Sequence, residues 1–175
     1  DDKGRKRALE GLLGEDKLGY MALLRNLNNL IKYGVSDKYK KLAIKKLTNP
    51  EEVKKSKQLP FRFVTAFDAV SGDREYSDAI SEAMDLAVSN TPEFKGDILI
   101  AVDSSGSMSE AIKKASIFAA TLLKSSPKAE VILYDTSIKQ LNLSGRTPVI
   151  DLAKTIEQNA MGGGTQASLV FQYAY

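Results

Sequence analysis

Apolar residues recur at helical spacing through the first half of the chain. The clearest stripe lies between Leu18 and Tyr33, where apolar positions three or four residues apart predict one buried helix face, and Gly34 follows as a stop signal. Asn49-Pro50 is typical of a helix start, because Asn is a favoured N-cap and Pro a favoured first helical residue. These signals predict a succession of short helices.

Two more helices are expected before residue 92. One begins after Pro60 and ends near Val70, where Ser71-Gly72-Asp73 breaks the pattern, and the other opens at Ser77. Short helices joined by short loops are typical of helical-repeat arrays. We therefore interpret residues 1–92 as part of such an array.

The pattern changes to that of a sheet after residue 92. Apolar runs at 98–102 and 131–134 predict neighbouring parallel strands buried on both faces, and residues 138–143 predict an edge strand. Helices are expected at 108–123, 147–158 and 166–175, with a glycine loop at 162–164. This alternation is typical of a doubly wound α/β sheet, so residues 93–175 are interpreted as a second domain.

The amino-acid composition excludes several classes of functional and structural site. The chain has no Cys and no His, which excludes disulfides, Cys/His zinc sites, thiol nucleophiles and Ser-His-Asp triads. No apolar run approaches the roughly 20 residues of a membrane span, and the charged start is unlike a signal peptide. We therefore expect a cytoplasmic protein without a membrane segment.

The residues best suited to chemistry follow the first predicted strand. Asp103-Ser104-Ser105-Gly106-Ser107 leads from strand to helix, where an open parallel sheet has its ligand crevice. Asp103 supplies charge, and Ser105 and Ser107 supply hard hydroxyl oxygens of the kind that suits Mg²⁺ or Mn²⁺. The alternative is an ordinary helix cap. A phosphate loop and a hydrolase elbow are disfavoured because their signatures are absent.

The complete D-x-S-x-S string is followed by Gly163-Gly164-Thr165 about sixty residues later. Together they resemble the metal-ion-dependent adhesion site of von Willebrand factor A (vWA) domains. The resemblance implies Ser105 and Ser107 as direct ligands, Asp103 as the first acidic member and Thr165 as the ligand from the second loop. The family's second acidic ligand follows a later strand, so we expect the first half of a vWA domain here.

Two segments of the helical half carry a further resemblance. Residues 21–27, Met-Ala-Leu-Leu-Arg-Asn-Leu, and 59–62, Leu-Pro-Phe-Arg, precede the vWA-like string. They resemble the end of the TROVE module of Ro-type RNA-binding proteins. The resemblance implies the last HEAT-like repeats of a ring that a truncated Rossmann-like parallel sheet, the vWA domain, would close. It also implies single-stranded RNA ends and Y-like small RNAs as partners, with an exoribonuclease as a further partner.

Local charge agrees with an RNA partner. The chain as a whole is only weakly basic, with 25 Lys and Arg against 22 Asp and Glu. Between residues 38 and 57, however, eight Lys face two Glu, a net charge of +6. Lysines on helices neutralise phosphates without reading sequence. The candidate RNA contacts are Arg25, Asn26, Lys40, Lys41, Lys45 and Lys46. The alternative is a solvated polar face.

We therefore expect a non-enzymatic RNA-binding protein whose vWA part holds a divalent cation, with Mg²⁺ as the expected ion. The runner-up is a vWA protein-interaction module in which the metal accepts a carboxylate from a partner protein. A metal-dependent hydrolase is disfavoured because no general base is evident.

Overall fold

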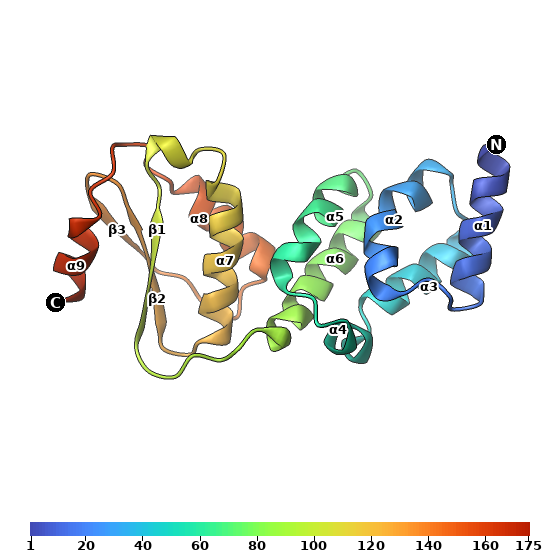
Figure 1. Ribbon diagram of the computed structural model, residues 1–175, viewed down its shortest axis with the longest axis horizontal. Coiled ribbons are helices and arrows are strands. Elements are labelled where there is room, and N and C mark those ends of the chain that lie inside the picture. Colours follow the sequence, from blue (N-terminus) through green and yellow to red (C-terminus); the bar gives the residue numbers. More distant parts are fainter. The chain divides into compact units, whose positions relative to one another are not determined.

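Two units make up the chain in the computed structural model, which describes residues 1–175 (Figure 1). The first unit, Asp1–Asn90, is helical, and the second, Thr91–Tyr175, contains a small sheet with helices. The coarse expectation of an α part followed by an α/β part is therefore confirmed. HEAT-like repeat geometry in the first unit remains a prediction. None of the helices combines the length and the apolar character needed to cross a bilayer.

The helical unit is built from short helices around one apolar core. They are α1 (Asp2–Gly14), α2 (Tyr20–Lys32), α3 (Asp37–Leu47), α4 (Pro50–Ser56), η1 (Pro60–Phe63), α5 (Val64–Ala69), α6 (Arg74–Ala87) and η2 (Val88–Asn90). The stripe read from the sequence is buried, since Leu23, Leu27 and Leu30 of α2 are all at most 1% exposed. Their burial removes apolar surface from water, which is the main force that holds α2 in the unit.

Helix ends follow the sequence signals in two places and depart from them in a third. Gly34 takes a φ of +62° just after α2, and the Asn49 side chain accepts from the backbone N–H of Glu51 at 2.9 Å. The expected start at Ser77 is wrong: α6 begins at Arg74, and Asp73 is its N-cap. Ser77 instead donates its hydroxyl to the carbonyl of Val70, so it is an internal helix residue.

The sheet is mixed, not wholly parallel as the sequence predicted. Strands β1 (Ile98–Asp103) and β2 (Ala129–Tyr134) are parallel, and β3 (Ile138–Leu141) pairs with β2 in the antiparallel sense, in the order β1-β2-β3. The physical reason is the connection from β2 to β3, which is only residues 135–137. So short a loop makes a hairpin, whereas a parallel pair needs a crossover of a dozen or more residues.

Helices cover the two faces of the sheet unequally. The remaining elements are η3 (Gly106–Met108), α7 (Ile112–Ser125), α8 (Val149–Gln158) and α9 (Ser168–Ala174). Figure 1 shows α7 and α8 on one side of the sheet and α9 on the other; α7 packs on β1 and β2, and α9 contacts β3. Val131, Ile132 and Leu133 of β2 are consecutive buried residues, as expected for burial on both faces. For β1 that expectation is wrong, because Ala101 is exposed.

Candidate functional site

The candidate cation loop lies where two parallel strands end. Asp103, the last residue of β1, pairs with Tyr134, the last residue of β2. The loops that follow the two strands therefore leave the same edge of the sheet, which is where open α/β sheets bind ligands. The predicted pairing of these strands, with the loop of residues 103–107 at their carboxyl ends, is confirmed.

Two hydroxyl oxygens of this loop lie close together. Ser105 Oγ and Ser107 Oγ are 3.2 Å apart, and the Ser105 N–H donates to Asp103 Oδ1 at 2.9 Å. Adjacent ligands of an octahedral Mg²⁺, each roughly 2.0 to 2.1 Å from the ion, are about 2.9 Å from one another. The spacing of the two hydroxyls therefore fits a shared cation of this size, with the Asp103 carboxylate beside them.

The second predicted loop is hydrogen-bonded to the first. Gly162 N–H donates to the Ser104 carbonyl at 2.8 Å, and Gly106 N–H donates to the Gly163 carbonyl at 2.9 Å. A Cβ on Gly106 would lie 3.0 Å from the Gly162 carbonyl oxygen, so a glycine allows this close approach. Thr165 is exposed and follows Gly163 by two residues. The structure thus brings together the two loops, with Thr165 on the second.

Asp135 is a buried acid at this edge that the sequence analysis missed. Asp135 is only 4% exposed. Its Oδ1 accepts a hydrogen bond from the Ser137 N–H at 2.8 Å, and its Oδ2 accepts one from the Gly163 N–H at 3.0 Å. Burial acts to raise the pKa of this carboxyl, but the bonds from Ser137 and Gly163 more than offset it and lower the pKa. Its position directly after β2, like that of Asp103 after β1, was the available signal.

The candidate RNA residues on α2 differ in their freedom to bind. Arg25 is exposed. Asn26 is half-buried, donates its amide to the Ala22 carbonyl at 2.8 Å and accepts from Asn29 Nδ2 at 3.0 Å. Arg25 is therefore available to a ligand, whereas the Asn26 side chain is occupied within its own helix.

The four candidate lysines of α3 form two classes. Lys40 Nζ lies 2.8 Å from Asp73 Oδ2 and 3.0 Å from Glu75 Oε1, and Lys46 Nζ lies 2.6 Å from Asp16 Oδ1. Their side chains are only 18% and 14% exposed. Lys41 and Lys45 are exposed. The ammonium charges of Lys40 and Lys46 are already balanced by nearby carboxylates, so they attract a phosphate less than those of Lys41 and Lys45.

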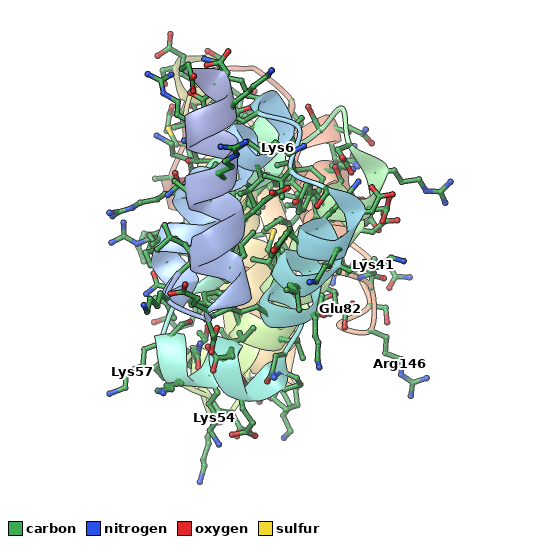
Figure 2. All side chains as sticks on the ribbon, turned by 90° about the vertical axis from the view of Figure 1, so that its right-hand side faces the viewer. Lys6, Lys41, Lys54, Lys57, Glu82 and Arg146 are labelled. Atoms are coloured by element: carbon green, nitrogen blue, oxygen red, sulfur yellow. The ribbon has the colours of Figure 1, made fainter.

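Further exposed lysines lie at the end of the neighbouring helix, α4. Lys54 and Lys55 lie in the last turn of α4 and Lys57 is its C-cap, and all three are exposed. Figure 2 shows Lys54 and Lys57 extending away from the ribbon in different directions. Sequence reasoning counted these residues in the basic segment but left them out of the candidate contacts. The exposed positive charge of the segment is therefore spread over α3 and α4.

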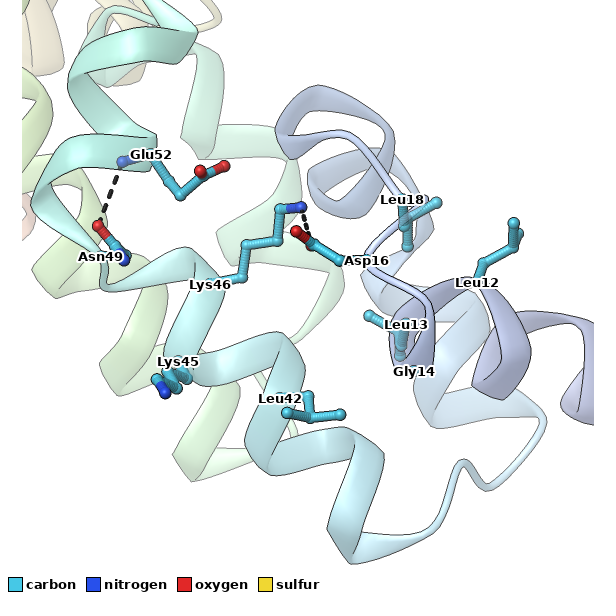
Figure 3. Close-up of a pocket in the computed structure, with 10 residues that line it drawn as sticks. All are labelled: Leu12, Leu13, Gly14, Asp16, Leu18, Leu42, Lys45, Lys46, Asn49 and Glu52. Carbon is cyan, nitrogen blue, oxygen red and sulfur yellow. Dashed lines mark hydrogen bonds and ion pairs between the residues drawn. The ribbon is translucent and has the colours of Figure 1, made fainter.

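A pocket of about 300 Å³ opens beside the candidate lysines (Figure 3). Its lining is partly apolar and partly charged: Leu12, Leu13, Gly14, Asp16, Leu18, Leu42, Lys45, Lys46, Asn49 and Glu52. Leu12 and Leu42 are 39% and 38% exposed, which leaves apolar surface next to the ammonium groups. The Lys46–Asp16 pair crosses between α3 and the loop after α1. Lys45 is the exposed cation at this pocket.

The Lys40–Asp73 pair predicts a pH-dependent stability. Burial acts to raise the pKa of Asp73, but the Lys40 ammonium and the Tyr76 N–H lower it overall. Stability from this charge is therefore present above the ordinary pKa of 3.8 and is lost as the pH falls through the lowered value. We expect Asp73→Asn, which preserves an N-cap side chain, to cost about 1 kcal/mol at pH 7 and much less at pH 2.

Urea denaturation followed by circular dichroism at both pH values measures this effect. Asp78→Asn is the matched control, because Asp78 lies in the helix that Asp73 caps and pairs at 3.6 Å with Arg74 in an exposed position. Equal pH dependence in the two variants would show that the Lys40–Asp73 pair adds nothing.

Comparison with known proteins finds similarity within the helical unit. Residues 4–75 match the family model of the TROVE domain. The chain is 39% identical over 69 residues, 39% of its length, to Telomerase protein component 1 of Mus musculus. It is 39% identical over 66 residues, 38% of its length, to the same protein of Rattus norvegicus. These segments are 3% and 2% of the two relatives, so the chain spans a very small part of them.

The structural comparison extends further along the chain. The crystal structure of the Deinococcus radiodurans Ro (RSR) protein matches with a TM-score of 0.67 at 24% sequence identity, over 85% of this chain and 34% of that one. Coverage of 85% takes the likeness in fold past residue 90 into the α/β unit. The TROVE resemblance read from residues 21–27 and 59–62 lies inside the matched segment and is confirmed. Within this chain, therefore, residues 4–75 are similar to the TROVE domain, and the likeness to the Ro protein is one of fold.

Proposed function

We propose that this chain is part of a Ro-like RNA-binding protein, in which the helical unit binds RNA and the α/β unit holds a divalent cation in a vWA-type site. The observation that carries the proposal is the TROVE match over residues 4–75, a segment that also contains the basic stretch from residue 38 to 57. In this proposal the protein binds RNA in the cytoplasm and catalyses no reaction.

The exposed lysines are the proposed phosphate contacts. Lys41 and Lys45 on α3, together with Lys54 and Lys55 on α4, have exposed side chains and reach phosphates without first losing an internal partner. Lys40 and Lys46 are the weaker candidates, because Asp73 and Asp16 already balance their charges. Lysine contacts to phosphates neutralise charge whatever the bases are. The proposed ligands are accordingly single-stranded RNA ends and Y-like small RNAs, with an exoribonuclease as a proposed protein partner.

The proposed cation is Mg²⁺, with Mn²⁺ as an equally suitable probe. Ser105 and Ser107 would bind it directly, Thr165 would join them from the second loop, and Asp103 would balance its charge. Support comes from the 3.2 Å separation of the two serine hydroxyls and from the hydrogen bonds that join the two loops. When bound, the ion would supply positive charge at the carboxyl edge of the sheet. Few charged ligands surround it, so its affinity should be modest.

A salt titration tests the RNA proposal. The full chain is mixed with a fluorescent single-stranded RNA, and anisotropy is measured from 50 mM to 400 mM salt. We expect binding whose log-log slope against salt is about −0.7 for each phosphate neutralised, and therefore near −3 for four lysine contacts. A chain that binds no RNA even at 50 mM salt would contradict the proposal. Magnesium-dependent capture of a carboxylate-bearing protein by the same chain would then favour the vWA protein-interaction function.

A further inference from the structure

Asp135 holds both ends of the short segment that contains Thr165. Its side-chain Oδ2 accepts from the Gly163 N–H at 3.0 Å, and its backbone carbonyl accepts from the Gln166 N–H at 2.8 Å. Gly164 and Thr165 lie between these two anchored residues. One residue at the end of β2 therefore restrains the chain on either side of Thr165.

The same segment is tied on its other side to the serine loop. Gly163 donates its N–H to Asp135, and its carbonyl accepts from the Gly106 N–H at 2.9 Å. Gly106 lies between Ser105 and Ser107. A continuous path of hydrogen bonds thus leads from the Asp135 carboxylate through Gly163 to the loop that carries the two hydroxyls.

The fit between Asp135 and residue 163 requires a glycine. A Cβ built on Gly163 would collide with Asp135 Oδ2. The backbone does not itself demand glycine there, because Gly163 is absent from the positive-φ residues, unlike Gly162 at +79°. The close approach of the carboxylate is therefore the reason for a glycine at this position. Ser137 bonds Oδ1 with both its N–H and its hydroxyl, which fixes the orientation of the carboxylate.

We propose that Asp135 is a positioning residue of the cation site: its carboxylate holds Thr165 against Ser105 and Ser107 before any cation binds. This inference rests on the proposed cation site and adds to it a residue outside the D-x-S-x-S string. A loop that is already ordered loses less freedom when the ion binds, so the affinity is higher. Asp135 is not a ligand in this proposal and acts only through Gly163 and Gln166.

Asp135→Asn in the full chain is the direct test. An amide has one oxygen, so it cannot accept from both Ser137 and Gly163 as the two carboxylate oxygens do. We expect the Mn²⁺ affinity, measured by calorimetry, to fall roughly 10- to 100-fold, the usual range for groups that orient metal ligands. Ser137→Ala is the matched control: it removes the hydroxyl bond to Oδ1, keeps the bond that the Gly163 N–H donates to Oδ2, and should cause a smaller fall.

Amide hydrogen exchange, measured without metal, tests the same variant independently of cation binding. In Asp135→Asn the Gly163 amide should exchange faster, because it loses its charged acceptor. The Gln166 amide should keep its protection, because its acceptor is the backbone carbonyl of residue 135, which the substitution retains. General unfolding would instead expose both amides. Unchanged protection of Gly163 would overturn the proposal.

A second pair of variants tests the contact from the other side. Gly163→Ala should weaken Mn²⁺ binding in the parent chain, where its methyl meets Asp135, and should add little in an Asp135→Ala background. If the effects of the two changes on Mn²⁺ affinity are simply additive, or if Asp135→Asn binds Mn²⁺ as the parent does, the proposed role of Asp135 is wrong.

If Ser105→Ala abolishes Mn²⁺ binding while Asp135→Asn does not weaken it, only this inference fails. If the parent chain binds no Mn²⁺, the cation site itself is wrong and the inference fails with it.

Discussion

Replacement of Lys41, Lys45, Lys54 and Lys55 together by glutamine is expected to remove most of the RNA affinity of the chain. Each lost phosphate contact takes about 0.7 from the log-log slope against salt for single strands, and four contacts take nearly 3. At about 0.1 M salt this corresponds to a fall of roughly 10²- to 10³-fold relative to the parent, a difference that vanishes as the salt approaches 1 M. Anisotropy titrations of parent and variant over the same salt range measure both quantities.

A variant of equal charge separates direct contact from general attraction. Lys95, Lys114, Lys128 and Lys139 are exposed and lie in the α/β unit. Changing all four to glutamine lowers the net charge by the same amount as the first variant. We expect it to leave the slope nearly unchanged. If both variants lose RNA affinity equally, the RNA is attracted by net charge alone and the proposed contacts on α3 and α4 are wrong.

Local sequence signals were sufficient for features that depend on a single helix or strand. The stripe that includes Leu23 and Leu27 predicted the buried face of α2, because burial follows directly from 3.6-residue periodicity. The antiparallel β3 was missed for a different reason. An apolar run indicates a strand but carries no direction, which depends on whether the connecting segment is long enough for a crossover. The connection between β2 and β3 has only three residues, so β3 runs antiparallel to β2.

The candidate sites show a similar division. The D-x-S-x-S string placed Ser105 and Ser107 together because their spacing lies within a single loop. Asp135 was not found because its partner, Gly163, is 28 residues away and meets it only after folding. The pairing of Lys40 with Asp73, across 33 residues, was hidden for the same reason. A count of charges along the chain overestimates the free lysines whenever tertiary contacts neutralise some of them.

Simultaneous Ser105→Ala and Ser107→Ala is expected to abolish cation binding and leave RNA binding intact. The two changes remove both direct hydroxyl ligands proposed for the ion, and alanine offers no oxygen to replace them. Changes to groups that only orient metal ligands already cost roughly 10- to 100-fold in metal affinity, so the loss of two ligands should lower the Mn²⁺ affinity by more than about 100-fold. Calorimetry with Mn²⁺ measures the loss, and Ser109→Ala, an exposed serine just beyond the same loop, is the control.

The RNA titration of this double variant distinguishes the two proposed activities. The serines lie in the α/β unit and make no proposed phosphate contact, so the slope against salt should equal that of the parent chain. The four-lysine variant should behave in the opposite way, with normal Mn²⁺ binding and a flattened RNA slope. If the serine variant loses RNA binding while the lysine variant retains it, the RNA site lies in the α/β unit, and the cation takes part in it directly.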